Sequence, residues 1–379
     1  MPKLSNPLRK TVVLLRRIRF RRDSEVILIA SRHGHFLAEV SKHRTSFFLD
    51  PTAFPIILSA RFFWTFFKLR GSVSRVSQYV IATVASCNSR VVIATDAVKE
   101  LTEIAQKLPS IEVIAIMHGF YIDQKGLMLR EQWNYERESP VTLFALGDYD
   151  TTHYRRWGNR HKKILPIGSV NNCLYLKSRN PGHETFDLCI IQGSLNPLAS
   201  DEFSLTRLRN WELIFRYVNQ LMSHSELQIS VALSSSSNEA LVRDWIESRL
   251  ANATFFRSSV ERFATYRAVD SSLISIGEAS TALVEGVARG NRCLAMNFSK
   301  LDLLSLPLPP ILSLIRPSFE EFRDRLNLLS AMPAEEFADL VAEDIRKVIN
   351  VDEQDLAITK IQTYIDEVCN KTSLVRSKT

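Results

Sequence analysis

Short apolar runs alternate with amphipathic segments along most of the chain. The runs have the length and β-branched content of buried strands, and the segments between them have the spacing of helices with one apolar side. Strands that alternate with helices predict an α/β fold with parallel sheets. The expected strands cover residues 25–31, 45–50, 90–96, 112–117, 142–147, 163–169, 186–191, 227–233, 254–257, 273–276 and 293–296. The expected helices cover residues 73–88, 97–108, 148–158, 205–222, 238–250, 259–268, 280–289, 319–329, 334–349 and 355–368.

Polar residues interrupt this alternation around Pro181-Gly182-His183, so we place a domain boundary between residues 176 and 184. A chain of 379 residues is long enough for two domains that each bury a core. The expected units are a basic N-terminal segment (1–22), an N-terminal Rossmann-like domain (23–178), a C-terminal Rossmann-like domain (179–350), and a C-terminal helix with a tail (351–379).

One strand–helix–strand unit near the C-terminus has the features of a phosphate site. The run Leu273 to Ile276 ends at Gly277-Glu278, and a helix is expected to begin at Ser280-Thr281. The free N–H groups and the dipole of such a helix N-terminus attract phosphates. Glu285 follows one turn later on the same face, where its carboxylate could accept hydrogen bonds from a ribose. The alternative is an ordinary crossover in which Gly290 only ends the helix.

Histidines and aspartates follow three of the expected strands in the first domain. His33 and His35 follow the first strand, His118 follows the fourth, and Asp148 and Asp150 follow the fifth. Because ligands of open parallel sheets bind at the carboxyl ends of the strands, these side chains are candidates for an acid or base. The alternative is structural, since the neighbouring glycines serve turns and aspartates cap helices.

Two stretches resemble known transferases. Residues 277–290 (Gly-Glu-Ala-Ser-Thr-Ala-Leu-Val-Glu-Gly-Val-Ala-Arg-Gly) resemble the nucleotide-sugar signature of GT-B glycosyltransferases. Residues 112–175 resemble the middle of bacterial capsule and O-antigen transferases, with "His-Gly-Phe-Tyr", "Phe-Ala-Leu-Gly-Asp-Tyr-Asp" and "Ile-Leu-Pro-Ile-Gly-Ser" in the same order. The resemblance implies two Rossmann-like domains facing a cleft, with C-terminal helices packing back onto the first domain. It also implies a nucleotide-sugar donor and a surface-polysaccharide or lipid-linked acceptor.

The resemblance further implies a division of roles. The N-terminal domain would bind the acceptor and supply the base, with His118 as first candidate and His33, His35, Asp148 and Asp150 behind it. The C-terminal domain would bind the donor. The residues expected to do so are Gly193, Ser194, Ser234, Arg257, Glu278, Ser280, Thr281 and Glu285. Inversion and retention both stay open, because a carboxylate could also act as a nucleophile.

No cofactor is expected beside the donor, and a metal-independent reaction is favoured. The one tight Asp-x-Asp pair, Asp148-Tyr149-Asp150, is expected to cap a helix, while Arg257, Lys125 and Arg32 could neutralise the leaving phosphate. The 5 cysteines form no CxxC pair, which indicates reduced thiols in a cytosolic protein.

The formal charge of +7 is concentrated at the N-terminus, where eight basic residues and no acidic residue precede Asp23. The apolar run from Thr11 to Leu15 is too short for a signal peptide. Residues 54–70 are rich in aromatic side chains and are edged by arginine and lysine, which describes either core packing or an interfacial helix. Together, residues 1–22 and 54–70 predict a peripheral protein at the cytoplasmic face of the membrane. No recognised nucleic-acid motif accompanies the basic segment, so no nucleic-acid partner is expected.

Two alternatives remain open. The His-Gly loop also resembles teichoic-acid-type polymerases, which transfer a polyol phosphate from a cytidine nucleotide. Those enzymes carry further histidine motifs in the second domain, whereas this chain has only His183 and His224 there. The chain could also be a noncatalytic partner in polysaccharide assembly.

Overall fold

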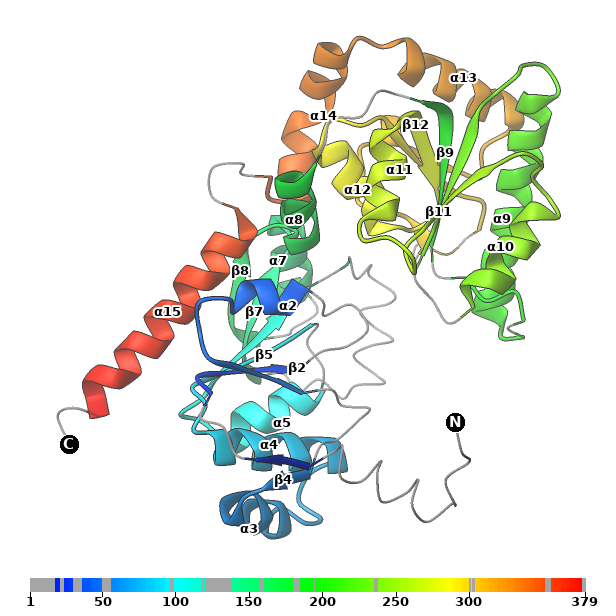
Figure 1. Cartoon of the computed structure of the whole chain (residues 1–379). Coiled ribbons are helices and arrows are strands. Elements are labelled where there is room, and N and C mark those ends of the chain that lie inside the picture. The colour runs from blue at the N-terminus through cyan, green and yellow to red at the C-terminus, as the bar shows by residue number, and fades with distance from the viewer. Residues whose placement is uncertain are drawn as a thin grey trace, which may run out of the picture.

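Two six-stranded parallel sheets, each flanked by helices, make up the structure, which is a computed structural model (Figure 1). This arrangement confirms the predicted α/β fold of two Rossmann-like units. The structure describes residues 18–20, 24–29, 36–49, 56–95, 99–117, 119, 138–156, 160–179, 185–193, 195–198, 200–234, 238–299, 301, 304–351 and 356–376.

In the N-terminal sheet the strand order reverses between the second and third strands of the spatial order given next. In spatial order it consists of β3 (Ser46–Leu49), β2 (Val26–Ile29), β5 (Val91–Thr95), β6 (Glu112–Ile116), β7 (Glu138–Ala145) and β8 (Arg160–Pro166). Every residue of β5 and β6 is buried, because a parallel sheet is covered by helices on both faces. The continuous apolar runs seen in the sequence are therefore the central strands of a doubly covered sheet.

Alternate side chains of these strands enter two different hydrophobic clusters. Val92 and Val113 join the cluster with α4 (Arg75–Cys87) and α5 (Lys99–Lys107). Ile93 and Ile114 join the opposite cluster, which contains side chains of α2 (Leu37–Val40), α8 (Val170–Ser178) and α15 (Ala357–Arg376). This split follows from the two-residue period of a strand.

The C-terminal sheet has the same parallel character. Its spatial order is β11 (Thr254–Arg257), β10 (Ile229–Leu233), β9 (Phe186–Gln192), β12 (Ser272–Gly277), β13 (Cys293–Asn297) and β14 (Ser313–Ile315). The helices of this unit are α9 (Glu202–Met222), α10 (Glu239–Glu247), α11 (Ala264–Asp270), α12 (Thr281–Ala288) and α13 (Phe319–Ala331). Its chain order also runs outward in both directions from one pair of strands, β9 and β12.

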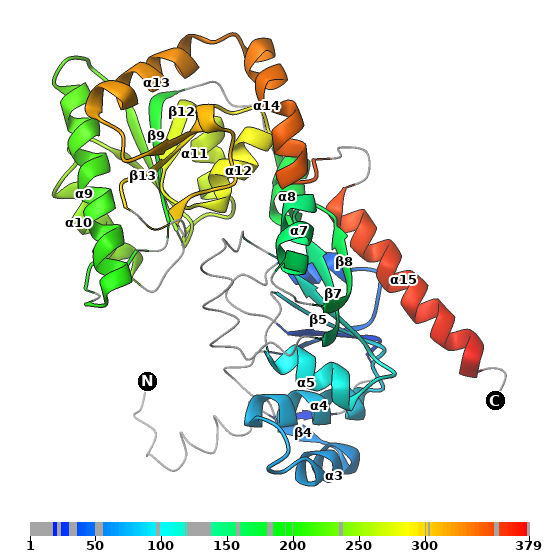
Figure 2. The same cartoon turned by 180° about the vertical axis from the view of Figure 1, so that it is seen from behind.

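The chain returns to the first sheet through α14 (Ala334–Val348), after which α15 lies along the N-terminal unit (Figure 2). Two glycines allow the returning backbone to come close. A Cβ atom on Gly147 would lie 2.3 Å from the carbonyl oxygen of Val348, and one on Gly168, whose φ is +95°, would lie 2.4 Å from that of Asn350. The Asn350 N–H donates to the carbonyl of Leu146 at 2.8 Å. The expected return of the C-terminal helices is confirmed.

Several elements were not predicted from the sequence, among them α8 and β14. Residues 170–178 form α8, and the side chain of its N-cap residue Ser169 accepts from the N–H of Asn172 at 3.1 Å. Residues 138–140, which precede the expected strand 142–147, already belong to β7. Residues 313–315 form the edge strand β14, which pairs with β13. No helix in the described part of the chain is both long and apolar enough to cross a membrane.

Candidate functional site between the two domains

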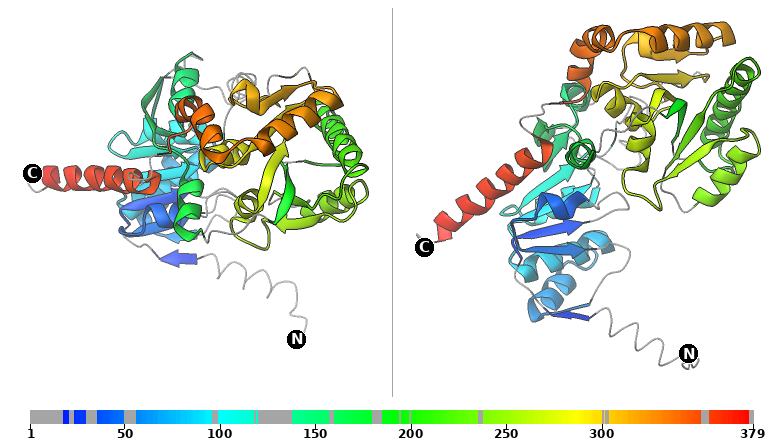
Figure 3. Two further views of the ribbon diagram at one scale, coloured as in Figure 1. Left: turned by 90° about the horizontal axis from the view of Figure 1, so that it is seen from above. Right: turned by 45° about the horizontal axis from the view of Figure 1, so that its top comes forward.

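The carboxyl ends of the two sheets face each other across the domain junction (Figure 3). Gly119, just past the end of β6, approaches Thr281 at the start of α12. A Cβ atom on Gly119 would lie 3.1 Å from Thr281 Oγ1. The loop position after β6 and the helix after β12 therefore meet, although 162 residues separate them in the numbering of the chain.

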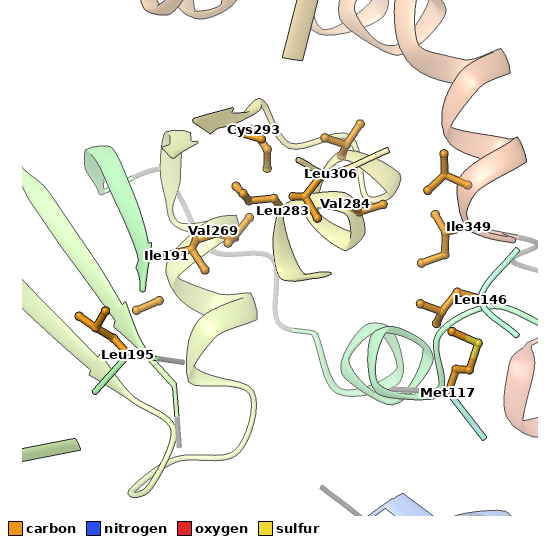
Figure 4. Close-up of a cluster of buried hydrophobic side chains, with 14 of the residues drawn as sticks. Met117, Leu146, Ile191, Leu195, Val269, Leu283, Val284, Cys293, Leu306 and Ile349 are labelled. Carbon is orange, nitrogen blue, oxygen red and sulfur yellow. The ribbon is translucent and has the colours of Figure 1, made fainter. Parts of the chain in front are cut away.

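A continuous apolar seam holds the junction together. In one buried cluster, Met117 and Leu146 of the first domain and Ile349 of the returning segment are joined with Leu283 and Val284 of α12 (Figure 4). All five side chains are nearly or fully buried. Burial of this seam fixes how the carboxyl ends of the strands face one another.

The N-terminus of α12 lies where the strand order of the C-terminal sheet reverses, between β9 and β12. β9 pairs with β10 on one side and with β12 on the other. In open α/β sheets the crevice at such a reversal is where ligands bind. Ser280 is the N-cap residue, and its side chain makes no capping hydrogen bond, while Thr281 begins the helix. Gly277 permits close packing here, because a Cβ atom would lie 2.8 Å from the carbonyl oxygen of Ile191.

Glu278 is buried beside this helix N-terminus and holds α9 in place. Its side chain is 1% exposed and accepts from Arg207 Nε at 2.6 Å and from Asn210 Nδ2 at 2.8 Å. Arg207 also approaches the turn after β9, where a Cβ atom on Gly193 would lie 3.1 Å from its Nη2. Glu278 thus positions an arginine where the strand order of the sheet reverses, and its expected contact with the donor stays a prediction.

Glu285 joins the two domains in this structure. It is 3% exposed. Ser169 Oγ, from the first domain, donates to one carboxylate oxygen, and Tyr266 OH donates to the other at 2.9 Å. Since both oxygens already accept hydrogen bonds from protein hydroxyls, the expected ribose contact is not what this arrangement shows. The role of Glu285 in donor binding stays a prediction.

Arg289 is the centre of a buried polar cluster at the same junction. Its side chain is 1% exposed, its Nε donates to Asp270 at 3.0 Å, and its Nη1 donates to Asn172 Oδ1 of α8 at 2.7 Å. The guanidinium also lies over the rings of Tyr175 and Tyr266. Sequence reasoning missed Ser169, Arg207, Asp270 and Arg289. Ser169 was visible as the end of the Ile-Gly-Ser pattern and Arg289 lies within the quoted stretch 277–290, whereas Arg207 and Asp270 had no local signal.

The remaining donor candidates lie along the same sheet edge. Arg257 donates from Nε to Glu239 at 2.7 Å, and its side chain is 42% exposed. Burial by itself would raise the pKa of Glu239, but hydrogen bonds from Ser259 and Arg257 outweigh burial and lower that pKa. Ser234 lies at 3.5 Å from Gln192 Oε1 through both its N–H and its hydroxyl. Glu239 therefore orients the Arg257 side chain at the end of β11.

The two aspartates after β7 have different surroundings. Asp148 is exposed and lines a cavity of about 610 Å³ together with Arg346 and Asn350. Asp150 is 2% exposed and accepts from the N–H of Leu146 at 3.1 Å. Burial raises the pKa of Asp150 to about 7, although backbone N–H groups of Leu146 and Gly147 oppose the shift. Asp150 closes the turn into α7 (Asp148–Arg156), which agrees with its capping interpretation.

Six predicted site residues lie outside the described residues, namely Arg32, His33, His35, His118, Lys125 and Ser194. The nearest described positions are the end of β2, Met117 with Gly119, and Gly193. In the described part of the chain, no group of three or more His, Cys, Asp or Glu side chains is placed to hold a metal ion.

Comparison with known proteins decides the fold. The chain is similar to a UDP-GlcNAc 2-epimerase from Methanocaldococcus jannaschii in complex with UDP-GlcNAc and UDP, with 12% identity, 89% of this chain and 99% of that one covered, and a TM-score of 0.55. The chain has a GT-B fold. A variant of the wall teichoic acid polymerase TagF is similar at 11% identity over 98% of this chain and 99% of the other, with a TM-score of 0.54.

A third similar structure is the UDP-GlcNAc 2-epimerase from Neisseria meningitidis bound to UDP-GlcNAc, with 11% identity, 91% and 99% coverage, and a TM-score of 0.50. Neither the models of known protein families nor the curated proteins match the chain. At these identities the likeness extends to the arrangement of the chain and not to its chemistry.

Proposed function

We propose that the chain is a glycosyltransferase that moves a sugar from a nucleotide-activated donor to a surface-polysaccharide or lipid-linked acceptor at the cytoplasmic face of the membrane. The observation that carries the proposal is the meeting of Gly119 with Thr281. It brings the carboxyl end of β6 to the helix N-terminus at the reversal point of the other sheet. A donor held by one domain would thus face an acceptor held by the other.

The donor diphosphate would bind at the N-terminus of α12, where the N–H groups and the dipole of a helix favour negative charge. Arg207 and Arg257 lie at the same sheet edge, and each is oriented by a buried carboxylate, Glu278 or Glu239. Positive groups held in place before the reaction stabilise the charge that develops on the leaving phosphate. These residues support the proposed transfer without a metal ion.

The acceptor hydroxyl would have to lose a proton as it attacks the sugar. A base within hydrogen-bond reach is needed for this step. His118 remains the first candidate because it precedes Gly119 directly, with His33, His35 and Asp148 as further candidates. Asp150 is a poorer candidate, since it is buried and bonded to the backbone of its own turn.

The similar epimerase and TagF structures suggest two other reactions for the proposed cleft. The names of two similar epimerase structures include UDP-GlcNAc, and that of one TagF structure includes CDPG. Because the similarity to a TagF variant extends over nearly the whole of both chains, transfer of a polyol phosphate is our second candidate. A noncatalytic role in polysaccharide assembly is the remaining alternative.

The test begins with nucleotide binding. A panel of UDP, GDP, CMP, CDP and dTDP is added to the full chain, and the melting temperature is measured, since a ligand that binds only the native state raises it. We expect one base to be selected. Thr281→Val should weaken binding of that nucleotide roughly tenfold, as expected for a lost hydrogen bond to a charged group. Thr254→Val, at an exposed position of β11, is the matched control.

The reaction products then distinguish the candidate activities. The chain is incubated with a membrane extract that contains lipid-linked acceptors. Separate reactions receive a labelled sugar donor of the selected nucleotide, labelled CDP-glycerol or labelled UDP-GlcNAc. Labelled sugar in the lipid fraction supports glycosyl transfer, labelled glycerol phosphate supports the second candidate, and an epimerised free donor excludes both. Absence of any nucleotide-dependent shift on folded protein would move the function to the noncatalytic alternative.

A further inference from the structure

A short helix of the N-terminal domain is attached by one aromatic face and exposes another. α3 (Ala60–Lys68) begins at Ser59, whose side chain accepts from the N–H of Phe62. Phe62 is 5% exposed, stacks on Phe66 at 5.8 Å and meets the edge of Tyr79 at 5.4 Å. The side chain of Gln78 donates to the carbonyl of Phe66. α3 is therefore firmly packed on α4.

The opposite face of α3 consists of large aromatic side chains in water. Phe63 is 41% exposed, Trp64 is 74% exposed and Phe67 is 63% exposed. Residues three and four apart lie on the same side of a helix, so these three rings form one surface. Core packing explains Phe62 and Phe66 and leaves this outer group unexplained, since adjoining exposed rings of this size mark an interaction site.

Positive charge surrounds this group of rings. Arg61, Lys68 and Arg70 are exposed on the same segment. Residues 51–95 contain five basic and no acidic side chains. All charged side chains of residues 51–95 are therefore positive, and the exposed aromatic rings of α3 lie among them.

A backbone pairing joins a strand near the N-terminus to the chain just before α3. β1 (Ile18–Phe20) pairs in parallel with β4 (Ile56–Leu58), with Arg19 opposite Ile57. β4 leads into α3 through Ser59 alone. The backbone of β1 therefore lies beside the strand that leads into α3.

We propose that Phe63, Trp64 and Phe67, with Arg61, Lys68 and Arg70, form a docking surface for an anionic lipid bilayer. Aromatic rings are favoured at the boundary between headgroups and acyl chains, and basic side chains are attracted to anionic headgroups. Nucleic acid would match the charge but would not require three adjoining rings on the outside of a helix. The bilayer satisfies both features at once.

The position of the surface leaves the cleft accessible. α3 lies at the end of the N-terminal domain that is remote from the C-terminal domain in both opposite views (Figures 1 and 2). Docking there would leave the domain junction uncovered. The inference is independent of the proposed reaction, since it rests on α3, β1 and β4 and not on the cleft.

The primary test is co-sedimentation of the full chain with vesicles. Vesicles of phosphatidylcholine alone are compared with vesicles that also contain phosphatidylglycerol, and we expect binding to the anionic ones. Trp64→Ala/Phe67→Ala should reduce the partition coefficient at least about tenfold, because two large apolar side chains leave the interface. Leu198→Ala/Val260→Ala is the matched control. These side chains are 77% and 73% exposed on the C-terminal domain, and their loss should not change binding.

Two further variants separate insertion from charge attraction. We expect brominated lipid to quench the tryptophan fluorescence of the unmodified chain. Trp64→Phe should keep most of the binding but lose most of this quenching. Lys68→Gln/Arg70→Gln should lower binding to anionic vesicles about thirtyfold and reduce its salt dependence, since each basic residue contributes about 1 kcal/mol near such a surface.

The proposal is overturned by equal binding of the unmodified chain to neutral and anionic vesicles, or by no effect of Trp64→Ala/Phe67→Ala in protein whose circular dichroism is unchanged. Binding of an RNA or DNA duplex that displaces the vesicles and ignores the aromatic variant would instead assign the basic segment to nucleic acid. Loss of vesicle binding in both the α3 variant and the Leu198→Ala/Val260→Ala control would indicate nonspecific adsorption.

Discussion

Asp150→Asn should change how the stability of the N-terminal domain depends on pH. Asp150 is 2% exposed, and burial raises its pKa to about 7 from an ordinary value of 3.8. Below pH 3.8 the carboxyl is protonated in both the folded and the unfolded chain. As pH rises from there to about 7, the unfolded chain releases the proton while the folded chain keeps it. Stability is therefore lost through this window and changes no further above it.

The size of the loss follows from the two pKa values. Each pH unit inside the window costs up to about 1.4 kcal/mol, so the change between pH 5 and pH 8 is about 2.5 kcal/mol. Asparagine has nearly the same shape, its side-chain oxygen can accept from the N–H of Leu146, and it does not titrate. We expect Asp150→Asn to remove this part of the pH dependence and to be the more stable protein at pH 8.

Hydrogen exchange of peptides from β7 and α7, measured at both pH values, reports the opening free energy of this region without mixing it with the other domain. The difference between variant and unmodified protein should grow by about 2.5 kcal/mol from pH 5 to pH 8. Asp148→Asn, at an exposed position two residues earlier on the same helix, is the control and should leave the profile unchanged. A parallel pH profile for Asp150→Asn and the unmodified chain would refute the reasoning.

Other substitutions test the contacts between the domains. Gly168→Ala and Gly290→Ala both place a side chain at positive φ, +95° and +89°, but only Gly168 faces a carbonyl, that of Asn350 at 2.4 Å. Both should therefore lose about 1 kcal/mol to backbone strain, and Gly168→Ala should lose clearly more in thermal unfolding. An equal loss would contradict the close contact. Arg289→Leu strips the buried Asp270 of a partner and should cost about 3–5 kcal/mol, whereas Arg323→Leu, which breaks an exposed pair with Asp324, should cost less than about 1 kcal/mol in the same urea titration. If the two losses were similar, the Arg289 cluster would not brace the junction.

Periodicity by itself predicted most of the elements. The runs that became β5, β6 and β10 were legible because every residue of these strands is buried, so a fully apolar strand needs no knowledge of its neighbours. The strand, helix and strand around Thr281 were legible for the same reason, with a cap and a glycine at the ends of the helix. α8 was missed because it lies at the junction. Its Val170 and Cys173 enter an apolar cluster while its Asn172 accepts from Arg289, so no single apolar stripe marks it.

The sequence by itself determined the class of fold, the order of most strands and helices, and the helix N-terminus at Thr281. Only the tertiary structure decided what the buried charges do. Glu278 finds Arg207, 71 residues away, and Glu285 finds Ser169, 116 residues away, in the other domain. A buried carboxylate must be hydrogen-bonded, but the pattern of apolar and polar positions specifies only that it is buried and not which distant group satisfies it. That choice depends on how the two sheets come together, and the donor contacts expected of Glu278 and Glu285 stay predictions.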